Sequence, residues 1–423
     1  MIDPKVLKDN PQHIKDMLKR RKVEYPFSEL LDIDKKRHEL IIETQNLRHR
    51  KNTLSQSIAN KKKNQENADK ELGEMKDVGE MMQSLEGEKS SVEKRYSELI
   101  YSIPNMLHES VPIGDGEGDN IVIRMHDDYI KSRSRTDHIE LANSFGLIDL
   151  ERAAKIAGSR FYFLKNGLVK MNQALINYGL DFLFEHGYQL IQPPFMLKNE
   201  AIKGSIIMGD FEDVIYKIEN EDLYLIGTSE HAMASMHMDE ILDSRKLPLR
   251  YASISPCFRK EAGAHGKDMK GIFRVHQFEK VEQFAISDSL NSFDEQERML
   301  NITERFYQSL EIPFRVVLLC SADTGKVSSK TYDIEAWMPG QNKYREIGSC
   351  SNCIDFQARR LRIRHREKVN EETQLVHTLN STLVATERTM VAILENYQTN
   401  NQTVIVPSVL RKYMEDIREI KTR

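Results

Sequence analysis

Two heptad repeats near the N-terminus constrain the fold of this chain more than any other feature of its sequence. Positions that alternate in steps of four and three residues run from Ile33 to Ile58 and again from Met75 to Leu99. This spacing is typical of coiled-coil seams, and a helix of about 33 residues would be about 50 Å long. The NKKKNQENADKE sequence between the runs is short and has no apolar period. The two helices are therefore predicted to form an antiparallel hairpin over residues 28–100, although a purely structural or dimerising coiled coil has the same periodicity.

Charge is distributed unevenly along this hairpin. Between Thr44 and Lys63 there are six Lys or Arg residues and no Asp or Glu, whereas Asn64–Ile100 has ten acids and five bases. The whole chain has a formal net charge of −4, which argues against a general nucleic-acid coat. The basic stretch is either a solvated charged face or a local contact with phosphates. Its cations are Arg48, Arg50, Lys51, Lys61, Lys62 and Lys63.

The remaining composition predicts a soluble protein of two or three domains. The chain has 423 residues, of which 39% are hydrophobic, and its apolar runs are far shorter than the roughly 20 residues that span a bilayer. The first residues, MIDPKVLKDN, lack the apolar stretch of a secretory signal, so the expected compartment is the cytoplasm. The four cysteines do not form a disulfide framework, and Cys350 and Cys353 have no second ligand pair, so no zinc is expected.

A domain boundary is predicted where Pro, Gly, Ser, Asn and Asp accumulate in SIPNMLHESVPIGDGEGDN, at residues 102–120. Such residues interrupt regular structure, so we expect an N-terminal domain at 1–101, a linker at 102–125 and a second domain at 126–423. In the second domain, strand-like runs such as RYASISPCF, FRVVLLC and TYDIEAWM follow one another with few helical segments between them. This order favours an α+β fold with an antiparallel sheet flanked by helices.

One segment of the second domain, FRKEAGAHGKDMKGIFRVHQFEKVEQF, combines six Lys or Arg residues with carboxylates. Its composition predicts a strand, a turn at AGAHGKDMKG and a second strand. By the two-residue period of strands, Arg259 and Glu261 share one face, as do Arg274, Phe278 and Glu282. Guanidinium groups suit phosphates, an aromatic ring suits a base, and carboxylates suit amines or hydroxyls. The segment therefore indicates a site for a nucleotide and an amino compound, with a solvated hairpin of paired charges as the alternative.

Six segments of the chain, taken in order, carry a family resemblance. FRKEAG and GIFRVHQFEKVE resemble motif 2 of class II aminoacyl-tRNA synthetases, in the form found in seryl-tRNA synthetases. GYQLIQPPFM at 187–196 resembles motif 1, and HTLNSTLVATERTMVAILENYQ at 377–398 resembles motif 3, with the Thr of archaeal and eukaryotic members. GSRFYFLKNG, GTSEHA and REIGSCSNCIDFQARR also match in order. The resemblance thus covers essentially the whole chain. A P-loop is excluded, because no G-x-x-x-x-G-K-[ST] sequence is present.

The resemblance implies that serine is attached to tRNA through a seryl-adenylate made from serine and ATP with Mg²⁺. It assigns catalysis to Arg259, Glu346 and Arg388, and the binding of Mg²⁺ to Glu346 and Ser349. The implied ATP contacts are Arg259, Lys260, Glu261, Arg274, Val275, Phe278, Glu346, Ile347, Gly348, Ser349 and Arg388. The implied serine contacts are Thr228, Ser229, Glu230, Arg259, Glu282 and Thr382.

The resemblance also implies macromolecular partners. In the family the helical arm grips the long variable arm of tRNA(Ser), and we assign this contact to the six cations of residues 44–63. We expect tRNA(Sec) as a further substrate where it is present, a homodimer built on motif 1, and no membrane partner. The chain departs from the family pattern at Glu387, just before Arg388, and at Gly348, where Ser is common. The alternatives are a stand-alone amino-acid-activating ligase and a noncatalytic RNA-binding paralogue.

Overall fold

The computed structural model describes residues 1–128, 136–211, 213–261, 271–399 and 403–421. These residues form two compact units, one of Met1–Leu18 and Val23–Ile103 and the other of Lys19–Lys22 and Pro104–Arg423. The short segment Lys19–Lys22 belongs to the second unit because Arg21 is buried among its carbonyl groups. The guanidinium donates to the carbonyl of Asn105 at 2.8 Å and to that of Thr324 at 3.0 Å.

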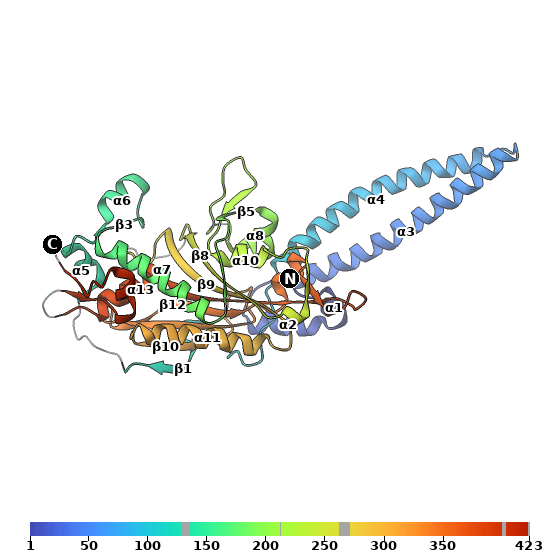
Figure 1. The fold of residues 1–423 in the computed structure, drawn as a ribbon. Helices are drawn as coiled ribbons and strands as arrows, with labels where there is room; N and C mark the ends of the chain where they lie inside the picture. The colour runs from blue at the N-terminus through green and yellow to red at the C-terminus, as the bar shows by residue number, and fades with distance from the viewer. Residues whose placement is uncertain (129–135, 212, 262–270, 400–402, 422–423) are drawn as a thin grey trace. The chain divides into compact units, whose positions relative to one another are not determined.

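The first unit contains the predicted helical hairpin. Its helices are α1 (Pro4–Asp9), most of α2 (Pro11–Arg20), α3 (Phe27–Lys63) and α4 (Asp69–Ser102). Helices α3 and α4 pack side by side along their length (Figure 1). The seam residues Leu40, Leu54 and Val78 are buried, whereas Lys51, at a predicted seam position, is exposed. Ion pairs join the helices in antiparallel order: Lys36–Glu88 at 2.9 Å, Arg50–Glu74 at 3.2 Å and Lys61–Glu71 at 2.7 Å. The antiparallel hairpin predicted from the heptads is confirmed.

The two long helices differ in glycine content. Helix α3 has no glycine, whereas α4 has Gly73, Gly79 and Gly87 in its interior. Apart from the adjacent residues and the backbone of α4 itself, no atom of the described residues lies within 4 Å of the place where a Cβ would stand at these three positions. Packing therefore does not require glycine there, and each glycine costs the helix about 0.5–1 kcal/mol relative to alanine.

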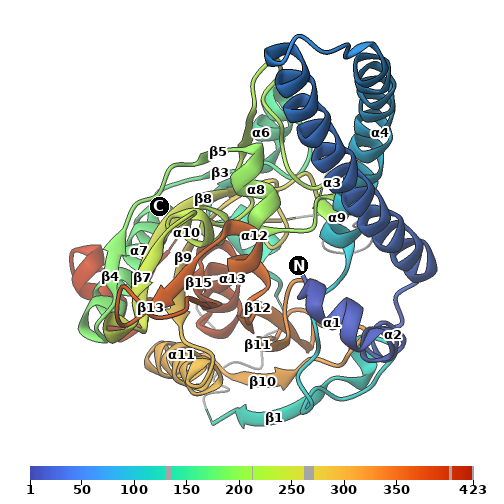
Figure 2. The same ribbon diagram turned by 90° about the vertical axis from the view of Figure 1, so that its right-hand side faces the viewer.

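The second unit is built on an eight-stranded sheet with the order β1-β10-β11-β12-β15-β9-β8-β4. Neighbouring strands are antiparallel except β4 and β8, which run parallel, so the predicted antiparallel sheet is confirmed (Figure 2). Strand β1 begins inside the segment predicted as a linker, whose last residues therefore belong to the sheet. The strands are β1 (Ile121–His126), β10 (Phe314–Leu318), β11 (Lys330–Met338), β12 (Lys343–Asn352), β15 (His377–Ala385), β9 (Gln277–Ser287), β8 (Leu249–Phe258) and β4 (Gln189–Ile191).

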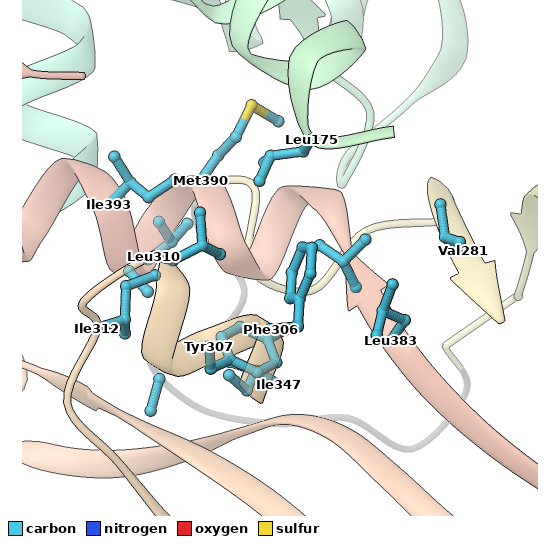
Figure 3. Close-up of a cluster of buried hydrophobic side chains, with 14 of the residues drawn as sticks. Leu175, Val281, Phe306, Tyr307, Leu310, Ile312, Ile347, Leu383, Met390 and Ile393 are labelled. Carbon is cyan, nitrogen blue, oxygen red and sulfur yellow. The ribbon is translucent and has the colours of Figure 1, made fainter. Parts of the chain in front are cut away.

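Helices cover both faces of this sheet. On one face pack α7 (Gly167–Glu185), α11 (Ser292–Ser309) and α13 (Thr386–Asn396). Figure 3 shows Leu175 of α7, Phe306 of α11, Met390 of α13 and Val281 of β9, all of which belong to the main hydrophobic core. Since side chains alternate along a strand, Phe284 of β9 faces the other side, where it packs with α10 (Ser229–Ser235) and α12 (Phe356–Leu361).

The second unit has shorter elements around the sheet. The helical ones are η1 (Glu117–Asp119), α5 (His138–Ser144), α6 (Leu150–Ala157), α8 (Asn199–Ser205), α9 (Met208–Phe211), η2 (Ser244–Lys246) and η4 (Ser408–Met414). The strands are β2 (Ile148–Asp149), β3 (Phe163–Leu164), β5 (Met196–Lys198), β6 (Leu223–Leu225), β7 (Ile241–Asp243), β13 (Arg364–Arg366), β14 (Gln374–Leu375), β16 (Val404–Ile405) and β17 (Glu419–Ile420).

The predicted strands of the FRKEAG segment are too long. Strand β8 ends at Phe258, so Arg259 and Glu261 do not share a strand face, and β9 begins only after Arg274. Arg259 still donates its N–H to the carbonyl of His276 at 2.9 Å, but Lys260 donates to the carbonyl of Val214 instead, and Glu261 has a φ of 49°, so the pairing does not continue. Residues 262–270, most of the predicted turn AGAHGKDMKG, lie outside the described residues.

Candidate active site

A cavity in the second unit gathers most of the residues predicted to act on ATP. It is lined from β9, β12, β15, α13 and the segments next to β8 and β9. The predicted residues in this lining are Arg259, Glu261, Arg274, Val275, Phe278, Glu346, Ile347, Gly348, Ser349, Thr382 and Arg388. Four lining residues have no predicted role: Phe273, Lys280, Ala385 and Glu387.

Bulges in two strands shape this cavity. The pairing of β12 with β11 shifts at Ile347, and that of β15 with β9 shifts at Leu383. A regular strand would turn Glu346 and Ser349, which are three residues apart, to opposite faces of the sheet. The bulge at Ile347 lets both line the cavity, and bulges of this kind are common next to active sites.

Within the described residues, the guanidinium of Arg259 is anchored through its Nε. Its Nε donates to the carbonyl of Gly227 at 3.0 Å, and its Cζ lies 5.2 Å from the centre of the Phe278 ring. The N–H of Gly227 in turn donates to Nδ1 of His231 at 3.4 Å. Burial, followed by the charge of Arg259, lowers the pKa of His231 to about 3, so the imidazole is neutral and accepts this bond. The anchored fork suits a phosphate group.

Two ion pairs hold the other arginines of the cavity. Arg388 contacts Oε2 of Glu346 at 3.0 Å, and Arg274 contacts Oε2 of Glu261 at 2.9 Å. The charge of Arg388 holds the pKa of Glu346 below its usual range, although burial opposes this. Arg388 also lies 5.2 Å above the ring of Phe273, which fixes its direction.

An acidic cavity of about 340 Å³ adjoins the first and shares Arg274, Glu346 and Arg388 with it. Asp333 lines this second cavity and is paired across the sheet with Ser349. Burial, and then the charge of Glu346, raises the pKa of Asp333 well above its usual range. The oxygens here are hard donors of the kind that Mg²⁺ prefers. Among the described residues no group of three or more His, Cys, Asp and Glu could hold a metal, so phosphate oxygens or water would have to complete the set.

Polar residues beside the first cavity suit a small amino acid. Glu282 of β9 and Thr382 of β15 are directly opposite each other, and Lys280 contacts the Glu282 carboxylate. Glu230 accepts a hydrogen bond of 2.9 Å from Gln357. Burial, and then the charge of Glu282, raises the pKa of Glu230 to about 7. Two carboxylates and a hydroxyl offer partners for an ammonium group and an alcohol.

Gly348 leaves space next to this pocket. A Cβ added there would lie 3.1 Å from Cβ and 3.2 Å from Cγ2 of Thr382. Serine at this position, which is common in the family, would press on Thr382 unless the backbone shifted.

Five predicted residues do not line the cavity. Thr228, Glu230 and Glu282 are set back from it, and Thr228 caps α10 by accepting from the N–H of Glu230 at 3.2 Å. The hydroxyl of Ser229 is fully buried and accepts from Ser253, and the exposed Lys260 has its Nζ 5.9 Å from the Tyr216 ring. Lys280 lines the cavity but was not predicted as a ligand. The sequence did contain a signal for it, because the two-residue spacing of a strand places Lys280 on the same face as Phe278 and Glu282.

Other predictions concern cysteines and membranes. Cys350 and Cys353 are both buried thiols, and burial raises the pKa of Cys350 to about 12. In the described part of the chain, no helix has the length and apolar character needed to span a membrane.

The basic stretch of α3 has two kinds of cation. Arg50 and Lys61 pair with acids of α4, as described above. Arg48, Lys51, Lys62 and Lys63 are exposed and have no ion-pair partner within the described residues. These four are therefore the cations that are available to an external anion.

Comparisons with known proteins identify the family. Residues 214–397 match the family model "tRNA synthetase class II core domain (G, H, P, S and T)", and residues 1–107 match "Seryl-tRNA synthetase N-terminal domain". The serine–tRNA ligase of Nitrosopumilus maritimus is 53% identical over 421 residues, which are 99% of this chain and 100% of that protein. The serine–tRNA ligase of Pyrococcus horikoshii is 44% identical, with 98% and 96% covered.

Solved structures agree with these matches. A crystal structure of seryl-tRNA synthetase from Pyrococcus horikoshii complexed with ATP has a TM-score of 0.91 at 43% identity and covers 100% of both chains. A cytoplasmic serine–tRNA ligase from Naegleria fowleri in complex with AMP has a TM-score of 0.84 at 34% identity, with 98% of this chain and 96% of that chain covered. Because close relatives match over their full length and both family models agree, the chain belongs to the seryl-tRNA synthetase family of class II aminoacyl-tRNA synthetases.

Proposed function

We propose that this chain is an ATP-dependent serine–tRNA ligase. In the first step the carboxylate of serine attacks the α-phosphorus of ATP, which forms seryl-adenylate and releases pyrophosphate. In the second step a hydroxyl of the 3′-terminal ribose of tRNA(Ser) attacks the activated carbonyl and releases AMP. No protein nucleophile is needed, because the residues act by positioning the reactants and stabilising the charge that develops on the phosphate.

The observation that carries the proposal is the convergence of ligands for phosphate, base and hydroxyl at one cavity. We assign Arg259 to the α-phosphate, Phe278 to the adenine ring and Arg388 to the γ-phosphate. Glu261 is assigned to the adenine amino group and Arg274 to the distal phosphates, and this pair is already in contact. Lys280 joins the predicted serine ligands, since it links the cavity to Glu282.

We also propose that Mg²⁺ accompanies ATP. Glu346 and Ser349 would hold it, because their oxygens line the same cavity and are hard donors. When bound, the ion neutralises part of the phosphate charge.

The proposed tRNA contact is through the basic stretch of α3. A long variable arm is a shape feature, and exposed cations can bind its backbone phosphates without reading bases. The same contact would serve tRNA(Sec) where it is present. The proposed compartment is the cytoplasm, which suits the four free thiols.

Two assays test the function. The first assay is ATP–pyrophosphate exchange, measured with each of the twenty amino acids. Exchange that depends on serine separates a synthetase or a stand-alone ligase from a noncatalytic RNA-binding paralogue. Acylation of tRNA(Ser) then separates the synthetase from a stand-alone ligase that loads another acceptor. Absence of serine-dependent exchange would overturn the proposal.

Serine is expected to be preferred over alanine in the exchange assay by about 10²-fold or more. Without the substrate hydroxyl, Glu282 and Thr382 would be left with unpaired polar groups in a buried pocket. Thr382→Val should therefore slow exchange with serine and leave the weak exchange with alanine unchanged. Equal rates for serine and alanine in the wild type would contradict this assignment.

The proposed quaternary structure is a homodimer built on motif 1. Its helix α7 and strand β4 carry the exposed apolar residues Phe184 and Leu190, which are 65% and 42% exposed, and β4 is an edge strand. An adjoining groove is lined by apolar residues that include Pro194, Met196 and Met236. An exposed apolar surface of this kind favours association with a second copy.

Sedimentation velocity at submicromolar concentration is expected to show a species of twice 49.1 kDa. Phe184→Glu should shift it toward the monomer, because a charge would be buried at the interface. Leu290→Glu is the matched control, since Leu290 is 91% exposed and lies outside motif 1. A monomeric wild type would refute the dimer.

A further inference from the structure

Glu387 is a buried carboxylate at the meeting point of three segments. It is 2% exposed and is the second residue of α13. Tyr162, which directly precedes β3, donates its hydroxyl to Oε1 at 2.5 Å. The N–H of Glu279 in β9 donates to both carboxylate oxygens, at 3.3 Å and 3.1 Å, and the Thr386 hydroxyl shares its one proton between Oε2, at 3.0 Å, and the carbonyl of Glu279. All of these partners are donors, so the carboxylate is the common acceptor of the junction.

The Glu387 carboxylate continues the hydrogen bonding of β9 beyond its last backbone pair with β15. The pairing of β15 with β9 ends where Ala385 is opposite Lys280. One residue further along β9, the N–H of Glu279 bonds to Glu387, and the carbonyl of Glu279 accepts from the hydroxyl of Thr386 at 3.3 Å. Side chains of α13 thus take the place of strand β15 and tie the start of the helix to β9.

The tied positions are next to two proposed ATP ligands. Phe278 precedes Glu279, Arg388 follows Glu387, and both ligands line the cavity. We propose that Glu387 is a positioning residue that holds Phe278 and Arg388 in one frame, so that the binding of ATP depends on it. The inference rests on the proposed function, because it takes these two residues to bind ATP.

Charged and titratable residues lie on each segment around Glu387. Tyr162 lies before β3, Glu279 and Lys280 lie on β9, and Arg388 lies on α13. Arg388 is paired with Glu346, and the Glu279 carboxylate accepts from Asn172 of α7. Three donors therefore decide which protonation state of Glu387 fits the junction. They are the Tyr162 hydroxyl, the Glu279 N–H and the Thr386 hydroxyl.

Protonation of Glu387 should loosen the junction. Burial raises its pKa to about 7, while the hydrogen bonds from Tyr162 and Glu279 oppose that rise. A protonated carboxyl group has one fewer site to accept from these donors. We therefore expect KM for ATP to rise as pH falls through about 7.

The test compares Glu387→Ala, Glu387→Gln and Tyr162→Phe in ATP–pyrophosphate exchange with serine. Glu387→Ala is expected to raise KM for ATP about tenfold or more while KM for serine changes less than about twofold, because the Glu279 N–H is left without its acceptor. Glu387→Gln keeps an acceptor oxygen, so it should recover part of the ATP affinity and should not show the rise in KM that the wild type shows below pH of about 7. Tyr162→Phe should give a smaller rise in KM for ATP.

Glu395→Ala is the matched control, because Glu395 is a buried carboxylate near the other end of the same helix. It accepts from the N–H groups of His138 at 3.2 Å and Gly340 at 2.9 Å. This variant should lower the thermal midpoint of unfolding but leave KM for ATP unchanged. An equal rise in KM for ATP in Glu395→Ala, or none in Glu387→Ala, would overturn the inference. If Glu387→Ala does not fold, the pH profile of Glu387→Gln decides: a slope like that of the wild type overturns it. Absence of serine-dependent exchange in the wild type overturns the proposed function instead.

Discussion

Arg259→Ala is expected to reduce serine-dependent ATP–pyrophosphate exchange by about 10³-fold or more, a reduction typical of removing a ligand of developing charge. Among the described residues the side chain is anchored through its Nε, and we expect its terminal nitrogens to bind the phosphate. Arg259→Lys should recover little, because an ammonium group cannot bond to the carbonyl of Gly227 and also present a planar fork. Near-normal exchange by the Lys variant would refute bidentate phosphate binding.

Stability separates this effect from misfolding. Arg259 lies in a polar cavity outside the main hydrophobic core, so the thermal midpoint of Arg259→Ala should stay close to that of the wild type. Arg305→Ala is a suitable control, because Arg305 is an exposed arginine of α11 and should tolerate the change in both assays.

Deletion of Thr44–Lys76, the outer part of the hairpin, is expected to lower acylation of tRNA(Ser) by orders of magnitude and to leave ATP–pyrophosphate exchange nearly unchanged. The deleted residues belong to the first unit, whereas every residue that lines the cavity belongs to the second. The deletion removes the proposed ligands of the tRNA phosphates and leaves every residue that lines the cavity in place. Normal acylation by the shortened protein would place tRNA recognition elsewhere.

Two sets of substitutions sharpen this test. The first set changes the four exposed cations without a partner, Arg48, Lys51, Lys62 and Lys63, to Gln. The control set changes Lys70, Lys76, Lys89 and Lys94 of α4 to Gln, which alters the net charge equally. Only the first set should weaken tRNA binding. It should also reduce the slope of log affinity against log salt concentration, by up to about 0.9 for each phosphate that the variant no longer binds. Equal effects of the two sets would mean that total charge, not this stretch, governs binding.

Local periodicity made much of the fold predictable. The heptads from Ile33 to Ile58 and from Met75 to Leu99 indicated the hairpin, because a seam repeats with the period of the helix itself. Alternation along the motif 2 segment placed Phe278 and Glu282 on one face of β9. Both patterns depend only on neighbours in the sequence, so no knowledge of distant contacts was needed.

The errors and omissions arose where distant contacts decide the structure. The lengths of β8 and β9 were overestimated because a bond from Lys260 to Val214 ends the ladder, and these residues are far apart in sequence. The bulge at Ile347 exists only in the pairing of two strands, so the shared direction of Glu346 and Ser349 came from the family pattern and not from strand periodicity. Likewise, the residues near Glu387 in the sequence do not indicate its hydrogen bond to Tyr162, because the two residues are far apart in the chain.

The uneven glycine content of the hairpin gives it a mechanical asymmetry. Each interior glycine of α4 lowers the cost of local opening, whereas α3 has none and keeps the stiffness of an uninterrupted helix. Bending should therefore concentrate in α4 near Gly73, Gly79 and Gly87, and amide protons there should exchange faster than those of α3. We therefore expect α3, which carries the proposed tRNA contacts, to be the stiffer helix of the hairpin, and α4 to be the more flexible helix that supports it.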